Sequence, residues 1–290
     1  MSLTKKGYDV TGVTRNSVPL EDMAAVQALL NKCAPDEIYY LAAYHHSSED
    51  KYPGDLELFR RSYEVNAFYP LHFLEAIRAL QIKSRFFYAS SSLIFGDSPV
   101  EEQHETSVYY PHSAYGITKL DGLMTCRYYR ENHGLFASTG ILFNHESQYR
   151  QAGFLSKKIT TAVWNSLEGS SDKLVIGNSA AEVDWGYAPD YVEAMHQVLL
   201  ADQPGEFIIA SGRKQSVRDF LEIAFGVVGL NWQDHVIENQ TQLQRNRRTI
   251  VGSPARLKKA TGWEPKTDFA QMIKLLVDAE GVRRKTCGIS

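Results

Sequence analysis

The stretch Arg85-Phe-Phe-Tyr-Ala-Ser-Ser-Ser-Leu-Ile-Phe-Gly96, followed by Ser113-Ala-Tyr-Gly-Ile-Thr-Lys119, decides the fold. Arg85 to Ser90 has the aromatic and small residues of a buried strand, and a run of three serines ends it. Tyr115 and Lys119 are four residues apart in a segment with helical periodicity, so they share one face of that helix. The pattern predicts a strand that ends in hydroxyls, beside a helix that carries a phenol and an amine.

This combination of side chains suits proton transfer. An ammonium favours the phenolate form of a nearby tyrosine, so we expect Lys119 to lower the pKa of Tyr115 from about 10 toward working pH. The hydroxyl of Ser91, at the strand end, can hydrogen-bond the same substrate oxygen. The alternative is that Tyr115 is an ordinary residue of an amphipathic helix and that Lys119 is its solvated neighbour.

The composition is that of an ordinary globular protein. The 290 residues are 43% hydrophobic and 22% charged, with a formal net charge of −3. This charge gives no basic footprint for nucleic acid or an anionic membrane, no apolar run could span a bilayer, and no secretory leader is visible. Three widely spaced cysteines, Cys33, Cys126 and Cys287, favour a reducing compartment without disulfides or a zinc site. We therefore expect a cytoplasmic protein with no metal.

Expected strands and helices alternate through the first half of the chain. The strands are expected at 8–14, 37–41, 85–90 and 137–143, and the helices at 21–32, 56–80 and 113–132. Such alternation favours an α/β fold with a doubly wound, mainly parallel sheet and helices on both faces. Beyond residue 145 the elements become shorter, although a capping box at Ser216–Asp219 predicts another helix. We expect a main domain over 1–145 and a smaller α/β lobe over 146–290, with some segments returning to the main sheet.

The start of the chain lacks an expected feature. A doubly wound dinucleotide fold begins with a strand, a glycine-rich turn and a helix whose N-terminus holds the pyrophosphate. This sequence contains no such turn, and a sheet without its first strand leaves backbone groups unpaired. We hypothesise that two segments are missing from this sequence, one between Leu3 and Gly7 and one near Ser17-Val18, and that the residues on either side of each are joined directly. Ordinary spacing of about 3.8 Å between consecutive Cα atoms there would refute this idea.

Three further motifs join the serine run and the Tyr-x-x-x-Lys pair. They are Gly140–Ser147 (GILFNHES), Asp184–Gly186 (DWG) and Gly262–Lys266 (GWEPK). Together these motifs resemble the extended short-chain dehydrogenase/reductase superfamily, and within it the GDP-mannose 4,6-dehydratase family and related nucleotide-sugar epimerases and reductases. The resemblance runs from residue 6 to about residue 280. It implies a Rossmann-like fold, an NADP cofactor (or NAD), a nucleotide-diphosphate sugar as substrate, and a homodimer.

The resemblance also implies roles for individual residues. Ser91 takes the place of the catalytic hydroxyl, Tyr115 that of the acid/base, and Lys119 that of its partner, which also binds the nicotinamide ribose. The expected cofactor-binding residues are Arg15, Asn16, Ser17, Ala42, Ala43 and Lys119, and the expected substrate-binding residues are Ser92, Asn144, Gly177, Arg245 and Arg247. A cation and a hydroxyl at 15–17, where NAD-preferring folds keep an acid, favour NADP. The alternatives are a solvated loop at 15–17 and a turn role for Asn144.

Two departures from the family pattern concern the substrate. Leu93 stands where 4,6-dehydratases place an acidic residue, and a leucine can neither protonate a leaving hydroxyl nor remove a proton. Val183 stands where they place an arginine that binds diphosphate. Arg245, Arg247 or Arg248 could clamp the phosphates instead, or they form only a solvated basic run.

A third departure from the family pattern lies in the loop after the expected strand at 37–41. Tyr44-His45-His46 replaces the usual Gln-Ser-His-like stretch, and the loop behind it is longer. His45 or His46 could act as an extra proton carrier, or could be a hydrogen-bonded structural histidine.

The expected function is an NADP-dependent oxidoreductase or epimerase acting at C4 of a nucleotide-linked hexose. Hydride would pass between C4 and the nicotinamide, and Tyr115 would exchange the proton of the C4 oxygen. Because of Leu93, we expect a 4-ketoreductase or a 4-epimerase rather than a 4,6-dehydratase. The alternative from another class is a non-catalytic dinucleotide sensor, but such proteins commonly lose the tyrosine or the lysine, and this chain keeps both.

Overall fold

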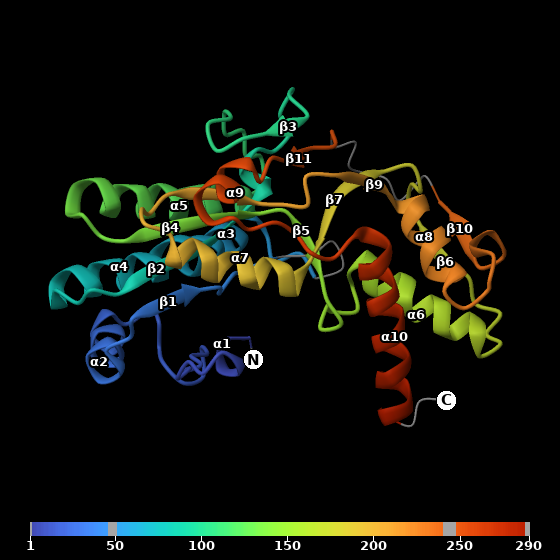
Figure 1. Ribbon diagram of the computed structural model, residues 1–290, viewed down its shortest axis with the longest axis horizontal. Coiled ribbons are helices and arrows are strands. Elements are labelled where there is room, and N and C mark those ends of the chain that lie inside the picture. Colours follow the sequence, from blue (N-terminus) through green and yellow to red (C-terminus); the bar gives the residue numbers. More distant parts are fainter. Residues whose placement is uncertain (1, 46–50, 240–247, 288–290) are drawn as a thin grey trace.

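The computed structural model describes residues 2–45, 51–239 and 248–287, and a parallel sheet forms the centre of its larger part, to the left in Figure 1. The strands are β1 (Glu37–Tyr40), β2 (Arg85–Ser91), β4 (Ala137–Leu142) and β8 (Glu206–Ile209). Their order is β1-β2-β4-β8, and each neighbouring pair is parallel. Tyr88 of β2 therefore lies between Tyr40 and Thr139. The expected α/β class and the expected parallel sheet are confirmed.

Helices cover both faces of this sheet. One face packs against α2 (Met23–Cys33), α4 (Tyr69–Leu80) and α5 (Ala114–His133), and the other packs against α7 (Ala188–Leu200) and α9 (Ala255–Thr261). Side chains alternate along a strand, so Phe86 and Tyr88 enter the first core and Phe87 enters the second. All three side chains are fully buried, which is why this strand is apolar on both sides.

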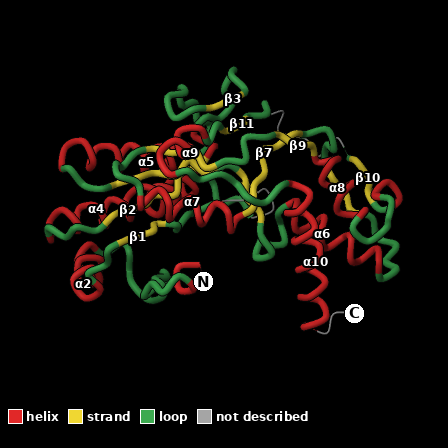
Figure 2. The backbone as a smooth tube through the Cα atoms, viewed as in Figure 1, coloured by secondary structure: helices red, strands yellow, loops and turns green. Residues whose placement is uncertain are grey.

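Shorter elements form a second lobe around a core of its own, to the right in Figure 2. Its strands are β5 (Asn144–Glu146), β7 (Glu182–Tyr187) and β9 (Lys214–Ser216) in one sheet, and β6 (Leu174–Ile176) and β10 (Val236–Glu238) in another. Its helices are α6 (Leu155–Leu167), α8 (Val217–Gly226) and α10 (Phe269–Cys287). The capping box expected at the start of α8 is confirmed: Ser216 and Asp219 cap each other's backbone N–H groups. We retain the domain boundary near residue 145 as a proposal.

The remaining elements are short or follow the main helices. They are α1 (Ser2–Lys5), α3 (Asp55–Tyr63), the π-helical turn η1 (Glu64–Phe68), the 3-10 turns η2 (Ser92–Ile94) and η3 (Trp232–Asp234), and the paired strands β3 (Glu102–Gln103) and β11 (Val251–Gly252).

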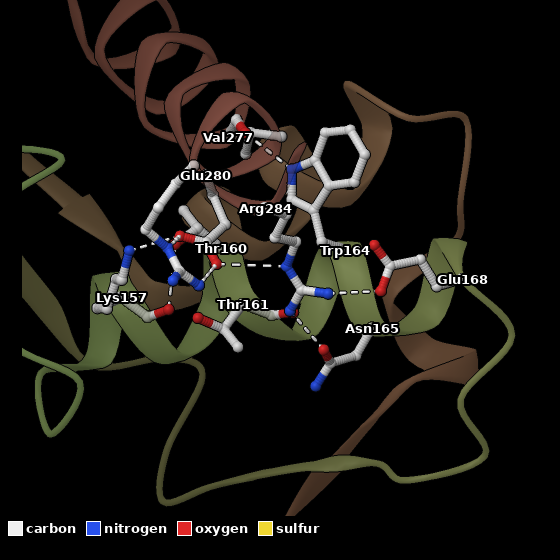
Figure 3. Close-up of polar contacts among 10 residues, drawn as sticks. Lys157, Thr160, Thr161, Trp164, Asn165, Glu168, Val277, Glu280 and Arg284 are labelled. Atoms are coloured by element: carbon white, nitrogen blue, oxygen red, sulfur yellow. Dashed lines mark hydrogen bonds and ion pairs between the residues drawn. The ribbon is translucent and has the colours of Figure 1, made fainter. Parts of the chain in front are cut away.

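A network of buried charges joins α6 to α10 (Figure 3). The Glu280 carboxylate, 2% exposed, accepts hydrogen bonds from Lys157 Nζ (2.5 Å) and from Arg284 Nε (3.3 Å). Arg284 also pairs with Glu168 (2.6 Å), and the indole N–H of Trp164 donates to the backbone of α10. Buried charges need such partners, because an unpaired charge away from water is costly.

The N-terminal segment differs from the expectation. Residues 8–14 form an exposed coil, so the predicted strand there is wrong. Backbone hydrogen bonds from Lys6 N to Leu3 O (2.9 Å) and from Val18 N to Thr14 O (3.2 Å) close turns at the two suspected junctions. Among the described residues only β2 pairs with β1, so a strand at 8–14 has no neighbour with which to form a ladder.

Candidate active site

The site lies where β2 ends and α5 begins, at the carboxyl end of the parallel sheet, which is where ligands bind in such folds. Ser91 is the last residue of β2, and its hydroxyl accepts a hydrogen bond from Leu93 N (3.2 Å) in η2. The hydroxyl of Ser113 caps α5. The first turn of α5 packs tightly on η2, since a Cβ on Gly116 would lie 2.6 Å from Leu93 O. Ser91 and Tyr115 thus belong to adjoining elements, as the sequence predicts.

Lys119 is buried behind Tyr115. Its Nζ donates to Ala89 O (2.8 Å) and lies 5.7 Å from the centre of the Tyr115 ring. The residue is 1% exposed, and burial lowers the pKa of its amine to about 7. The predicted neighbours are therefore together, but this ammonium loses much of its charge near neutral pH.

The expected effect of Lys119 on Tyr115 is wrong. Burial raises the pKa of Tyr115 to about 12, and the charge that opposes this rise comes from Arg150. The physical reason is that the same burial penalises both charged forms, the phenolate of Tyr115 and the ammonium of Lys119.

Asn66 is a site residue that the sequence analysis missed. It lies in the π-helical turn η1 and is fully buried. Its amide donates to Thr118 Oγ1 (3.0 Å) and to Tyr44 O (3.3 Å), and accepts from Tyr44 N (3.0 Å). Asn66 therefore ties the loop after β1 to the residue next to Lys119. A polar residue inside an apolar helical stretch was the available signal, and single π-helical turns often mark functional sites.

An aromatic wall stands beside Tyr115. The ring of His45 lies edge-on at 5.0 Å from the Tyr115 ring and 6.1 Å from Phe154. The guanidinium of Arg150 stacks on Phe154 at 3.7 Å. The structure thus places His45 beside the candidate acid/base, which is where it would have to lie to act as an extra proton carrier. His46 lies outside the described residues.

The residues expected to bind the cofactor fall into two groups. Ala42 and Ala43 follow β1 at its carboxyl end and are exposed. Arg15, Asn16 and Ser17 form an exposed turn in which Ser17 Oγ accepts from Thr14 N and donates to Thr14 O, both at 2.8 Å. Because no strand precedes this turn, nothing in the described fold aligns it with the sheet.

The residues that the resemblance assigns to the nicotinamide half of a dinucleotide, Ser91, Tyr115 and Lys119, all lie in the described part of the chain. No glycine-rich turn that could cradle a pyrophosphate occurs among residues 2–45, 51–239 and 248–287. The described part of the chain also contains no cluster of His, Cys, Asp or Glu that could hold a metal, and no helix there is long and apolar enough to cross a membrane.

The residues expected to bind substrate are dispersed. Ser92 is 7% exposed and lies in η2, next to Ser91. Asn144 is exposed at the start of β5, opposite Trp185 of β7. Gly177 follows β6, which belongs to the other sheet of the second lobe. Arg245 and Arg247 lie outside the described residues.

The comparisons with known proteins bear on this arrangement. A family model described as GDP-mannose 4,6 dehydratase matches residues 4–276. The chain belongs to the GDP-mannose 4,6-dehydratase family. It is 36% identical to GDP-mannose 4,6 dehydratase 1 of Arabidopsis thaliana, an alignment that covers 96% of this chain and 84% of that protein. It is also 36% identical to GDP-mannose 4,6 dehydratase 2 of Caenorhabditis elegans, over 90% of this chain and 72% of that protein.

Solved structures share the fold of this family member at lower identity. RMD from Pseudomonas aeruginosa, solved with NADPH, superposes with a TM-score of 0.78, 21% identity and coverage of 91% of this chain and 87% of that one. UDP-glucose 4-epimerase from Thermotoga maritima, solved with UDP-glucose, gives a TM-score of 0.76, 20% identity and coverage of 99% and 94%. The Rossmann-like fold predicted from the sequence is confirmed. The family to which the chain belongs is one of nucleotide-sugar enzymes.

Two further points follow from the relatives. The alignment with the Arabidopsis protein spans 310 positions, more than the 290 residues of this chain, so that relative contains internal segments that this family member lacks. The relatives' names also favour a dehydratase over the 4-ketoreductase or 4-epimerase that Leu93 predicts.

Proposed function

We propose that this chain catalyses oxidation or reduction at C4 of a GDP-linked hexose with NADP, and that Tyr115 is its acid/base. The observation that supports the proposal is that Tyr115 and Lys119 share one face of α5, whose first turn packs on the turn η2 that follows Ser91. A family whose members act on GDP-mannose supports the choice of substrate. The choice of NADP over NAD is based on the cation and the hydroxyl in the sequence Arg15, Asn16 and Ser17.

The chain's own residues perform the proton chemistry. Tyr115 takes the proton of the C4 hydroxyl when the sugar is oxidised and returns it when a C4 ketone is reduced. Ser91 donates a hydrogen bond to the same oxygen and orients it. Lys119 would hold the ribose of the cofactor, and a bound nicotinamide would supply or take the hydride.

Dehydration is the second candidate, and the relatives favour it. Elimination of water needs an acid for the leaving hydroxyl, and Leu93 cannot serve. His45 is a titratable side chain within 5.0 Å of the Tyr115 ring, so a dehydratase built on this site would use His45 for that proton.

Product analysis separates the two candidates. The protein is incubated with GDP-mannose and NADP, and with GDP-4-keto-6-deoxymannose and NADPH, and the sugar nucleotides are analysed by mass spectrometry. Loss of one water from GDP-mannose identifies the dehydratase, while consumption of NADPH with the keto-sugar identifies the reductase. Tyr115→Phe abolishes either activity. Tyr128→Phe, an exposed tyrosine of the same helix, is the matched control and retains it. No turnover of either sugar by the folded wild type contradicts the proposal.

A homodimer is also proposed. In this family-level arrangement, α5 and the helical region 56–80 form the contact. Both carry exposed large apolar side chains, among them Phe68 (52%) and Met124 (44%). Sedimentation equilibrium tests this point, and a monomer at micromolar concentration contradicts it.

A further inference from the structure

The N-terminal segment is held against α7 by very few side chains. Residues 4–17 are all exposed, so the burial of apolar surface contributes little to the position of this segment. In the described part of the chain, the hydrogen bonds and ion pairs that join residues 3–13 to other segments go to Glu193 and His196 of α7. These two side chains therefore decide whether α1 and the coil after it lie against α7 (Figure 1).

Lys6 and Tyr8 make these contacts from the two sides of Gly7. Gly7 has a φ of 86°, in the left-handed region that glycine adopts more readily than other residues. The Nζ of Lys6 donates to the Glu193 carboxylate (2.7 Å) and lies 3.2 Å from Nδ1 of His196. The hydroxyl of Tyr8 lies 3.1 Å from Nε2 of the same imidazole. Both ring nitrogens of His196 are thus in contact with the N-terminal segment.

The partners of His196 fix its charge and its tautomer. An ammonium has three donors and no acceptor, so Nδ1 of His196 must accept the hydrogen bond from Lys6. The ring proton is therefore on Nε2, which donates to the Tyr8 hydroxyl. The Tyr8 ring also meets the imidazole edge-on, with the ring centres 5.3 Å apart. His196 is 5% exposed, so little water competes for these contacts. The docked segment requires a neutral imidazole.

Glu193 is the negative group beside His196 on the same helix. Its carboxylate oxygens accept from Lys6 Nζ at 2.8 and 2.7 Å, and one of them also accepts from Gln197 (3.1 Å). The hydrogen bond from Lys6 holds the pKa of this carboxyl below its usual range, so Glu193 stays charged while histidine titrates. Glu193 therefore attracts a protonated His196 too, but only in competition with Lys6.

β1 brings two further titratable groups to this region, Glu37 and Tyr39. The hydroxyl of Tyr39 donates to the Glu37 carboxylate (2.6 Å). Burial raises the pKa of Tyr39, and the hydrogen bond to Glu37 and the charges of Tyr8 and Glu193 raise it further. Tyr39 is thus neutral, and Glu37 already has a donor. Lys6 remains the cation in direct contact with the imidazole.

We propose that Lys6, Tyr8 and His196 form a pH-sensitive latch, which holds the N-terminal segment on α7 and releases it when His196 is protonated. Protonation places an N–H on Nδ1, so the hydrogen bond from Lys6 is lost and two positive charges face each other across 3.2 Å. The docked form binds one proton fewer than the released form. Its share therefore falls as the pH falls through the range of about 5 to 8 in which histidine titrates, by up to about tenfold per pH unit.

Hydrogen exchange of the full chain tests the latch. The backbone N–H groups of Lys6, Gly7 and Tyr8 donate to carbonyls within the segment, and their exchange is followed by mass spectrometry from pH 8 to pH 5. Each rate is divided by the intrinsic rate at that pH. We expect this protection to fall about tenfold or more in the wild type, while circular dichroism stays unchanged. The latch does not depend on the proposed function, since its readout needs neither cofactor nor sugar.

Two variants separate the latch from a general effect of acid. Lys6→Met removes the ammonium, so a protonated His196 can pair with Glu193 and the protection should no longer fall at low pH. His196→Phe keeps a ring beside Tyr8 but cannot titrate, so its protection should not vary with pH. His133→Phe, an exposed histidine of α5, is the matched control and should keep the wild-type response.

Two results would overturn the latch. One is a wild-type protection that stays the same from pH 8 to pH 5. The other is a fall of the wild-type size in Lys6→Met or in His196→Phe, because acid would then loosen the segment through another group. Lys6 is 37% exposed, so its variant decides the question even if His196→Phe does not fold.

Discussion

Replacing Lys119 by methionine is expected to abolish activity and yet to stabilise the fold near neutral pH. The amine is 1% exposed, and burial lowers its pKa from 10.5 to about 7. In the unfolded chain at pH 8 it is protonated, so folding must remove that proton. Each pH unit of such a difference corresponds to about 1.4 kcal/mol, so the cost at pH 8 is about 3 kcal/mol.

Methionine avoids this cost and keeps a side chain of similar length. It forfeits the hydrogen bond from Nζ to Ala89 O, which is worth about 1 kcal/mol. The expected gain in free energy of unfolding at pH 8 is therefore about 2 kcal/mol. Stability gained by removing a functional group is a common trade-off in active sites.

The dependence on pH gives a sharper test. Between pH 7 and pH 10.5 the unfolded wild type binds the proton and the folded protein does not, so its stability rises with pH. Lys119→Met lacks this contribution, and the difference between the two proteins shrinks across the same window. Urea denaturation at pH 7, 8, 9 and 10, followed by circular dichroism, measures it. Lys274→Met, an exposed residue of α10, is the control and should stay within about 0.5 kcal/mol of wild type. A Lys119→Met protein that is less stable than wild type at pH 7, or a difference that does not vary with pH, would refute the reasoning.

Two further predictions concern the packing around the site and the second lobe. Gly122→Ala should destabilise the protein by about 1–2 kcal/mol in urea denaturation, because the added Cβ would lie 2.3 Å from the Tyr88 ring and this overpacking exceeds the gain in helix propensity. Gly226→Ala is the control: its added Cβ meets nothing within 4 Å, so it should be neutral or slightly stabilising. A Gly226→Ala protein that is less stable than Gly122→Ala would contradict this account. For Glu280, burial raises the pKa, but ion pairs with Arg283 and Lys157 outweigh it and lower the pKa from 4.5 to about 2, so this part of the stability is present above pH 4.5 and is lost as the pH falls toward 2. Glu280→Gln should flatten that acid limb in thermal melts, and an unchanged acid limb would show that the network in Figure 3 contributes little.

The parts of the fold that local signals determine could be predicted. The buried strand β2 and the capped helix α5 lie within a residue or two of the expected ranges, because the alternation of side chains and the cap at Ser113 are local features. The short strand β8 (Glu206–Ile209) was not expected, since it is recognisable only by its pairing with β4. The expected strand at 8–14 failed for the same reason, because a strand needs a neighbour that its own sequence does not reveal.

The candidate site, too, could be predicted only in part. Helical spacing placed Tyr115 beside Lys119. The pKa shifts of these two side chains could not be predicted, because desolvation depends on how deeply the completed fold buries each group. Asn66 and Arg150 were missed because each acts through partners far along the chain or through a loop whose path no periodic pattern describes.

The central claim is that Tyr115 removes the proton of the C4 hydroxyl while hydride leaves C4. Single-turnover reduction of NADP by GDP-mannose deuterated at C4, followed by absorbance of the reduced cofactor, tests it most directly. The account predicts slower cofactor reduction with the deuterated sugar than with the ordinary one in the wild type, and no reduction in folded Tyr115→Phe. Cofactor reduction by Tyr115→Phe at the wild-type rate, or a rate that ignores the deuterium at C4, would contradict it.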